Sequence, residues 1–491
     1  MTSTKSVAPV MALLVGALLW SQPLSANEVP GPRHTIAPHL FEGDDGKPVA
    51  AEWGRLVVPE NRTDPPSNLI EVPFVRFRSN APDPSEPYVF LSGGPGEESL
   101  GDNIRQFLPF VADLPFDLIL VEQRGVGHSR PRLDCADRYD LARDRPLDRA
   151  TLRAAEREHA RACAAFWADK GVDLTGYNAR EMASDVDALR RALGYDKINL
   201  LGGSFGSHHG LAVLRGFEDT VHRAVLSAVE GPDHTVKLPS TIQSYLDTLD
   251  AMVRADPDLS AHIPSLLELM ATVLDQLEAE PVTVTIVDPE TGDAVAIVVG
   301  KLDLQLMTAA GLGRTDFLKA LPRRYHAMAN GDFSWLGAAA LDYRTNRGGA
   351  LMGTLVDCAS GASADRRARI AAEAEDTLLG GAINGVQFDI CDVIGSADLG
   401  PDFRADLESD VPVLLVSAGL DPRTPVGNAK EVGAGLADSH HLIIDGVSHD
   451  FAMGDERLSA YIAMQVAFLS GQPPETTRIA VPFAFDPIAN R

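Results

Sequence analysis

The sequence lacks several features that would assign it to a common functional class. It contains no run of five or more Lys or Arg residues, and 69 acidic residues outnumber 43 basic ones, giving a formal net charge of −26. Because phosphate backbones repel such a chain, we expect no nucleic-acid partner. The chain also has no internal repeat, phosphate-binding loop or dinucleotide fingerprint. Its function must therefore be sought in single residues and short motifs.

Long hydrophobic runs are also missing, with one short exception at the N-terminus. Lys5 is followed by the apolar run Val7–Trp20 and then by a small-residue exit ending at Ala26. This run is too short to span a bilayer, but it is typical of a signal peptide. We expect residues 1–26 to be removed and the protein to be exported to the periplasm or the outside of the cell, with no stable membrane insertion. A buried N-terminal helix is the alternative.

Cysteine is scarce, and no CxxC spacing occurs, which argues against a zinc ribbon or a thioredoxin-like site. Two pairs of adjacent histidines lack the i, i+4 spacing of a helical zinc site, so we expect no metal and no cofactor. Because an even number of cysteines in an exported chain indicates disulfides, we expect the pairs Cys135–Cys163 and Cys358–Cys391, each closing a short loop. Four buried free thiols are the alternative.

Short apolar runs alternate with helix-compatible stretches over the first half of the chain. Residues 27–50 are rich in Pro and Gly and predict a lead-in loop. Alternation of strand and helix favours a mainly parallel sheet with helices on both faces. The expected strands cover residues 56–58, 70–78, 88–91, 118–122, 198–201 and 224–229.

The alternation stops after Glu230. Residues 232–409 are mainly helix-like, apart from a β-hairpin expected over residues 282–299. Strand patterns return at residues 411–416 and 442–444. We therefore expect a discontinuous α/β domain, residues 27–231 plus 410–491, with residues 232–409 inserted as a mostly helical lid.

The motif Gly202-Gly203-Ser204-Phe205-Gly206 matches G-x-S-x-G. It lies between an expected strand and an expected helix, the context in which such a serine is a nucleophile on a tight turn. A plain glycine-rich loop is the alternative. The context favours Ser204 as the nucleophile.

A serine nucleophile needs a histidine base and an acid that orients it. In this strand–turn–helix context the chain order is serine, acid, histidine. His449 follows the last expected strand, and Asp421 follows the strand before it. Asp445 is a rival acid on the same return as His449, whereas Asp410 precedes its strand. We expect Ser204, Asp421 and His449 to act together.

The reaction also needs N–H donors for the negative oxygen that develops in the transition state. One donor should be the residue after the nucleophile, Phe205. The other should lie in the loop after an early strand, and Gly94 in Ser92-Gly93-Gly94-Pro95-Gly96 fits that place. An ordinary Gly/Pro turn is the alternative.

Four motifs together resemble the prolyl aminopeptidases and the secreted tripeptidyl aminopeptidases. They are the loop Ser92–Gly96, the stretch Glu122–Ser129, the elbow Gly202–Gly206 and the acid loop Gly419–Pro425. The resemblance implies an α/β-hydrolase fold with a helical lid and assigns the catalytic and oxyanion roles to the same residues as above. It also implies removal of short peptides from a free N-terminus. Ser92 stands where the family usually has His.

Recognition of a free N-terminus needs carboxylates that pair with its ammonium group. Glu97 and Glu98 follow the oxyanion loop, in a place where small residues are commoner in the family, and Glu230 ends an expected strand. We expect at least one of the three to face the substrate amine, although solvated or structural acids are the alternative.

An esterase, lactonase or amidase that acts on a small molecule with the same residues is the second hypothesis. A non-enzymatic binding domain is the third, and it would require a broken triad. Nothing in the sequence indicates an oligomeric state.

Overall fold

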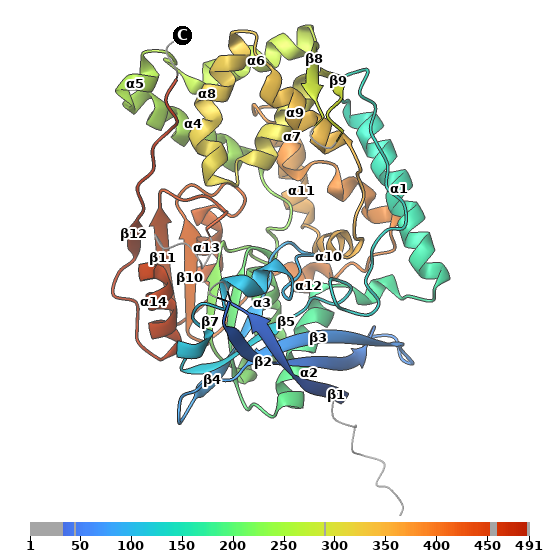
Figure 1. The fold of residues 1–491 in the computed structure, drawn as a ribbon, viewed down its shortest axis with the longest axis vertical. Helices are drawn as coiled ribbons and strands as arrows, with labels where there is room; N and C mark the ends of the chain where they lie inside the picture. The colour runs from blue at the N-terminus through green and yellow to red at the C-terminus, as the bar shows by residue number, and fades with distance from the viewer. Residues whose placement is uncertain (1–32, 44–45, 289–290, 452–458, 489–491) are drawn as a thin grey trace, which may run out of the picture. The chain divides into compact units, whose positions relative to one another are not determined.

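The largest feature of the fold is a mixed β-sheet, whose strands are labelled in Figure 1. The computed structural model describes residues 33–43, 46–288, 291–451 and 459–488. The predicted signal peptide, residues 1–26, lies outside this part of the chain. Among the described residues, no helix has the length and apolar character that crossing a bilayer requires.

Ten strands of the described chain form this sheet in the order β1-β2-β3-β5-β4-β6-β7-β10-β11-β12. The pairings β1–β2, β2–β3 and β3–β5 are antiparallel, and every pairing from β5 onward is parallel. The predicted mainly parallel sheet is thus confirmed. The strands are β1 (Arg33–Glu42), β2 (Pro48–Pro59), β3 (Leu69–Phe77), β4 (Ser85–Leu91), β5 (Phe116–Val121), β6 (Ile198–Gly203), β7 (Val221–Ser227), β10 (Val413–Ala418), β11 (Ser439–Asp445) and β12 (Arg478–Ala480).

The central strands are buried on both faces. Every residue of β5 and of β10 is buried, as expected for strands that are not exposed on either side. Of the flanking helices, α2 is capped at its N-terminus by Asn178, whose side chain accepts from the N–H of Glu181, and at its C-terminus by Gly194, with φ +77°. The flanking helices are α1 (Arg149–Asp169), α2 (Ala179–Leu193), α3 (Phe205–Phe217), α13 (Val426–Gly433) and α14 (Ser459–Leu469).

The prediction of a lead-in loop over residues 27–50 is wrong for most of the described part of that range. Residues 33–42 form β1, which pairs antiparallel with β2 from Arg33↔Val57 to Glu42↔Pro48. Because β1 is exposed along almost all its length, it has no alternation of apolar and polar residues that could reveal a strand. Strand β12 was not predicted either. The last predicted strand is longer than expected, and β11 includes both His440 and His441.

The chain between β7 and β10 is mostly helical, and in Figure 1 most of its helices lie above the sheet. The predicted hairpin is confirmed as β8 (Val282–Val287) and β9 (Ala294–Val299), which pair with each other and not with the large sheet. The helices are α4 (Pro239–Ala255), α5 (Pro257–Ser260), α6 (Leu266–Ala279), α7 (Lys301–Gly311), α8 (Thr315–Ala329), α9 (Ser334–Arg344), α10 (Met352–Ser360), α11 (Ala364–Glu373) and α12 (Gly400–Arg404).

The helices of the segment belong to two different hydrophobic cores. Leu246, Leu274 and Leu321 belong to a core that also includes Leu152 of α1. Met352 of α10 instead joins the core that surrounds α2 and β6. The end of the segment that includes α10 therefore packs against α2, one of the helices that flank the sheet. The predicted boundaries of the lid, residues 232–409, stay a prediction.

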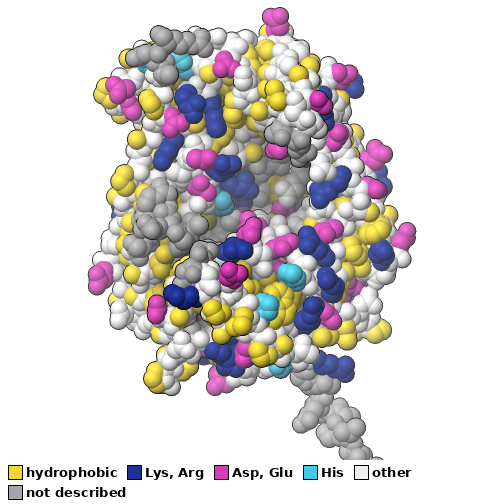
Figure 2. All heavy atoms as spheres, in the orientation of Figure 1, with side chains coloured by type: hydrophobic (Ala, Val, Ile, Leu, Met, Phe, Trp, Pro, Cys, Tyr) yellow, Lys and Arg dark blue, Asp and Glu magenta, His cyan; other side chains and the backbone are white. Residues whose placement is uncertain are grey.

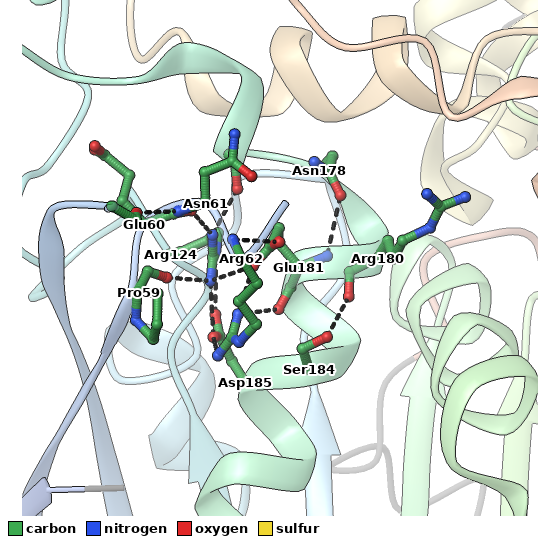
Figure 3. Close-up of polar contacts among 12 residues, drawn as sticks. Pro59, Glu60, Asn61, Arg62, Arg124, Asn178, Arg180, Glu181, Ser184 and Asp185 are labelled. Atoms are coloured by element: carbon green, nitrogen blue, oxygen red, sulfur yellow. Dashed lines mark hydrogen bonds and ion pairs between the residues drawn. The ribbon is translucent and has the colours of Figure 1, made fainter. Parts of the chain in front are cut away.

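A fully buried arginine fixes α2 against the strands on one side of the sheet (Figure 3). Arg124 donates to both carboxylate oxygens of Asp185, at 2.7 and 2.8 Å, and to the carbonyl oxygens of Glu60 and Gly176, each at 2.5 Å. Arg62 also binds Asp185, at 2.7 Å. These contacts give Arg124, from the stretch Glu122–Ser129, a structural role, because a buried charge is tolerated only when it is paired and hydrogen-bonded.

Two disulfides lie outside the large sheet. Cys135 is joined to Cys163 of α1, and Cys358 of α10 is joined to Cys391. This is the pairing expected from the sequence.

Candidate functional site

Ser204 lies at the turn between β6 and α3 in a strained backbone conformation. Its φ of 55° and ψ of −125° are unusual for a residue with a side chain. The flanking glycines make this turn possible, because a Cβ at Gly202 would lie 2.1 Å from the carbonyl oxygen of Gly206. A Cβ at Gly206 would lie 2.1 Å from the carbonyl oxygen of Leu91. The elbow therefore packs directly against the end of β4, where the loop that includes Gly94 begins.

The structure brings Ser204, His449 and Asp421 together from three separate loops. Ser204 Oγ lies 2.9 Å from His449 Nε2, and His449 Nδ1 lies 2.8 Å from Asp421 Oδ2. The Asp421 side chain is fully buried, whereas that of His449 is 17% exposed. A hydroxyl that can pass its proton to a ring oriented by a buried carboxylate is the arrangement of an activated nucleophile.

Asp421 is held as a carboxylate. Burial alone would raise its pKa, but the His449 ring and the hydroxyl and N–H of Thr424 outweigh burial and hold the pKa at about 2. Thr424 Oγ1 donates to Oδ2 at 2.5 Å, and the N–H groups of Arg423 and Thr424 donate to Oδ1 at 2.8 and 3.0 Å. Asp421 therefore remains negatively charged at neutral pH.

The loop that includes His449 is anchored to the helical segment. The Asp450 carboxylate accepts from the N–H and hydroxyl of Thr315, at 3.0 and 2.7 Å. The N–H of Ser448 in turn donates to Thr315 Oγ1 at 3.0 Å. The Ser448 hydroxyl donates to the carbonyl oxygen of Leu312 at 2.9 Å. The connection between α7 and α8 thus fixes the histidine loop.

The loop after β4 is fixed by one amide side chain, that of Gln123. Its Nε2 donates to the carbonyl oxygen of Gly93 and to the hydroxyl of Ser92, both at 2.9 Å, and its Oε1 accepts from Gly96 N–H at 2.9 Å. Within the described chain the N–H of Gly94 makes no hydrogen bond. Phe205 opens α3, where the first N–H groups of a helix lack intrahelical partners. Neither N–H group thus has a hydrogen-bond partner within the described chain.

A second buried side chain, Glu122, holds the far end of this loop. Its Oε1 accepts from Ser99 N–H at 2.7 Å, and the Ser99 hydroxyl donates to Ser92 Oγ at 2.9 Å. Burial raises the pKa of Glu122 to about 7, against the lowering effect of the Ser99 N–H. The position of the loop therefore depends on two adjacent residues at the end of β5.

Ser204 and His449 open onto a cavity of about 470 Å³, which we call the nucleophile cavity. Figure 2 shows this face hollowed between the sheet and the helical segment, with acidic and basic side chains around the hollow. The apolar part of the lining includes Phe90, Leu201 and Tyr461. A cavity of this size suits a small substrate or the end of a peptide.

The three acids proposed for the substrate amine lie in different places. Glu97 lines the nucleophile cavity, and its carboxylate makes no hydrogen bond or ion pair within the described chain. Glu98 does not line this cavity and lies 3.3 Å from Arg132. Glu230 is buried and binds Lys237 at 2.5 Å. Burial would raise the pKa of Glu230, but Lys237 and other nearby charges lower it overall.

The rival acids are placed elsewhere. The Asp445 carboxylate binds the guanidinium of Arg478 at 2.6 and 2.8 Å. Asp410 precedes β10, and its N–H donates to Glu218. The sequence analysis did not identify Gln123 as the residue that holds the oxyanion loop. Its position in the stretch Glu122–Ser129, one of the four motifs that resemble the aminopeptidases, is a signal that could have identified it. Within the described residues, no group of three or more His, Cys, Asp or Glu side chains is arranged to hold a metal ion.

A serine on a strand–turn–helix elbow, followed along the chain by an acid and a histidine after later strands, is the constellation of the α/β hydrolases. The chain belongs to this family, because the sequence profile of the α/β hydrolase fold matches residues 87–455.

Similar proteins include a serine protease, Hip1, of Mycobacterium tuberculosis strain H37Rv, which is 29% identical over 38% of this chain and 37% of that protein. A tripeptidyl aminopeptidase of Streptomyces coelicolor is 28% identical over 39% of this chain and 38% of that protein. The alignments thus span less than two fifths of these relatives. A solved proline iminopeptidase of Mycobacterium smegmatis is 14% identical over 85% of this chain and 98% of that chain, with a TM-score of 0.39.

Proposed function

We propose that this protein is a serine hydrolase that releases short peptides or single residues from free N-termini. The observation that supports it most directly is the chain of contacts from Ser204 Oγ through His449 to Asp421, at 2.9 and 2.8 Å. The arrangement opens onto the nucleophile cavity, where a carbonyl carbon can reach the hydroxyl.

In the proposed reaction, Ser204 Oγ attacks the carbonyl carbon while His449 Nε2 takes the hydroxyl proton. The N–H groups of Gly94 and Phe205 bind the negative oxygen that forms. His449 then gives the proton to the leaving amine, which departs and leaves an acyl group on Ser204. Water, deprotonated by His449, releases the acid and restores the serine. Asp421 holds the ring in the required tautomer and stabilises the imidazolium.

The preference for a free amine is supported by Glu97, whose carboxylate faces the nucleophile cavity without a partner in the described chain. An ammonium group in a partly enclosed site needs such a counter-charge. Two relatives named a serine protease and a tripeptidyl aminopeptidase are consistent with peptide hydrolysis. Glu98 and Glu230 already have basic partners, so Glu97 is the acid of the three that we propose for this contact.

Hydrolysis of a small-molecule ester, lactone or amide is the second candidate. It is favoured by the apolar lining from Phe90, Leu201 and Tyr461, which would bind an acyl chain as well as a peptide side chain.

The test compares three substrates of the mature protein: a free-amine peptide anilide, its N-acetylated form and a p-nitrophenyl ester. We expect the free-amine anilide to have the highest kcat/KM and Ser204→Ala to abolish both turnover and labelling by a fluorophosphonate. Glu97→Gln should raise KM for the free-amine anilide and leave the acetylated form nearly unaffected. Equal turnover of free and acetylated anilides, with faster ester hydrolysis, would favour the second candidate.

We also propose export, with residues 1–26 as a signal peptide and residues 232–409 as a lid inserted into a catalytic domain of residues 27–231 and 410–491. Two disulfides support an oxidising destination such as the periplasm or the outside of the cell. The N-terminal sequence of the protein recovered from outside the cytoplasm tests the cleavage site, which should leave Asn27 as the first residue.

A further inference from the structure

Arg423 lies where two cavities of the protein meet. Its backbone N–H donates to Asp421 Oδ1 at 2.8 Å, while the residue lines the nucleophile cavity. Arg423 and Ala310 also line a second cavity of about 580 Å³. A Cβ at Gly313 would lie 2.9 Å from Arg423 Cδ, so the arginine stem passes close to the connection between α7 and α8. The guanidinium is thus attached to an anchored stem beside the reacting groups.

The second cavity adjoins the nucleophile cavity, since Ala310 and Arg423 line both. It is lined by Pro95 and Gly96 of the oxyanion loop and, across from them, by residues of the helical segment such as Tyr343 and Gln387. Because Arg423 lines both cavities, a substrate bound at Ser204 that extends toward the second cavity would lie beside this side chain.

The other arginines that line the two cavities are already paired. Arg314 binds the Asp316 carboxylate at 2.7 and 3.1 Å, and Arg347 forms an ion pair with Glu156. The guanidinium of Arg423 makes no hydrogen bond or ion pair with any other residue of the described chain. It therefore offers donors and a charge that the fold itself does not use.

Two buried acids lie within electrostatic reach of Arg423, but neither neutralises it. Glu230 is bound to Lys237 at 2.5 Å. Burial and the negative charge of Glu230 raise the pKa of Asp357 to about 8, so that Asp357 is mostly uncharged at neutral pH. Neither acid is therefore a bound counter-ion of Arg423, and the exposed carboxylate of Glu97, which lines the nucleophile cavity with it, makes no ion pair with its guanidinium.

We propose that Arg423 binds a carboxylate of the substrate and makes this hydrolase selective for acidic substrates. The proposal rests on the proposed function, because it places the carboxylate on the molecule that acylates Ser204 or leaves from it. The carboxylate has two possible sources with the same chemistry. It is either the acidic side chain of a residue beside the cleaved bond or the free C-terminus of a short peptide. A guanidinium suits either one, since its fork of donors matches a carboxylate in two-point contact.

The test uses two pairs of substrates with a free N-terminus. The first pair is peptide anilides with Glu or Gln before the cleaved bond, and the second is short peptides with a free or an amidated C-terminus. We expect the wild type to favour the acidic member of at least one pair. Arg423→Met keeps a similar apolar stem but removes the charge, and it should reduce that ratio of kcat/KM by at least about 30-fold, as loss of one partner of a desolvated charge pair does. Arg423→Lys keeps a positive charge and should retain part of the preference for the acidic substrate.

The matched control is Arg314→Met, which removes a guanidinium that is already bound to Asp316 and should keep the wild-type ratio. Fluorophosphonate labelling of Ser204 reports whether each variant retains an assembled site. If Arg423→Met is labelled normally and both ratios stay at the wild-type values, the proposal is wrong. It is also wrong if the wild type favours the acidic member of neither pair.

Failure of the proposed peptidase activity has a different signature, in which the wild type hydrolyses esters but none of these peptides. The same variants are then compared on p-nitrophenyl esters with and without a terminal carboxylate on the acyl group. Loss of a carboxylate preference in Arg423→Met would support the role of Arg423 on a non-peptide substrate. An unchanged ratio, or no preference in the wild type, would overturn it.

Discussion

The guanidinium of Arg124 and the carboxylate of Asp185 form two hydrogen bonds, at 2.7 and 2.8 Å, with the arginine side chain fully excluded from solvent. The pair joins the residues just after β5 to the middle of α2. The same stretch after β5 includes Gln123, which holds the oxyanion loop. Two adjacent residues after β5 thus act in different places, since Gln123 holds the oxyanion loop and Arg124 forms the buried ion pair with α2.

Replacing Arg124 should therefore destabilise the fold. Arg124→Met leaves the Asp185 carboxylate buried with fewer partners, and we expect the free energy of unfolding to fall by about 3–5 kcal/mol. Arg55→Met is the control, because Arg55 and Glu71 form an exposed pair that should contribute only about 0–1 kcal/mol. Urea unfolding followed by circular dichroism measures both. Equal effects of the two substitutions would contradict the structural role of Arg124.

The assignment of the acid is tested by comparing two aspartates. Asp421→Asn removes the acceptor that fixes the His449 tautomer, and kcat should fall by roughly 10⁴-fold, as in other triads. Asp445→Asn should change kcat little, since Asp445 pairs with Arg478 and not with the histidine. Steady-state kinetics on one substrate measure both variants. A larger loss in Asp445→Asn would reverse the assignment.

Glu122 should make the stability of the protein depend on pH. Its pKa of about 7 in the fold lies above the ordinary value of 4.5, so the folded state holds the extra proton between these values. The free energy of unfolding should therefore fall as the pH rises from about 4.5 to about 7. Glu122→Gln lacks this dependence and should gain up to about 3 kcal/mol relative to the wild type above pH 7.

Urea unfolding at intervals between pH 4.5 and 8 measures this difference. Glu98→Gln is an informative second variant, because the negative charge of Glu98 contributes to the raised pKa of Glu122. Removal of the Glu98 charge should lower the pKa of Glu122, so that the free energy of unfolding falls over a lower pH range than in the wild type. Parallel stability curves for the wild type and Glu122→Gln would show that Glu122 titrates normally.

Both disulfides should be found in the exported protein. Peptide mass spectrometry without reduction should recover the links Cys135–Cys163 and Cys358–Cys391. Each bridge closes a loop with a sequence separation of 28 or 33 residues, and its removal by paired Cys→Ala substitution should lower the free energy of unfolding by about 2–4 kcal/mol. A peptide that links Cys135 to Cys358 or Cys391 would contradict the pairing.

The parts of the fold that could be predicted from sequence are those with a strong local signal. The elbow is an example, because Gly202 and Gly206 are required by contacts of 2.1 Å that no side chain could tolerate. Strand β1 gave no such signal, since it is exposed on both faces and is defined only by its pairing with β2.

In the candidate site, too, some residues have a local sequence signal and others do not. Ser204, Asp421 and His449 could be placed because each follows a recognisable strand. The neighbouring acids could not be ranked, because Glu97 and Glu98 are adjacent in sequence and only the fold directs one to the cavity and the other to Arg132. The sequence could not show that the Arg423 guanidinium has no partner for the same reason, since this depends on which groups the fold brings near it.

Strands β7 and β10 are hydrogen-bonded neighbours, although the whole helical segment lies between them in the chain. A parallel pair of strands needs only a crossover of a dozen or so residues. The register of these two strands therefore sets no limit on the length of the segment, while the turns that present Ser204 and Asp421 belong to the sheet. The content of the segment is constrained at one place, because Leu312 and Thr315 bond to the residues on either side of His449. A replacement segment could thus vary widely in length and still support catalysis, provided that it kept these contacts.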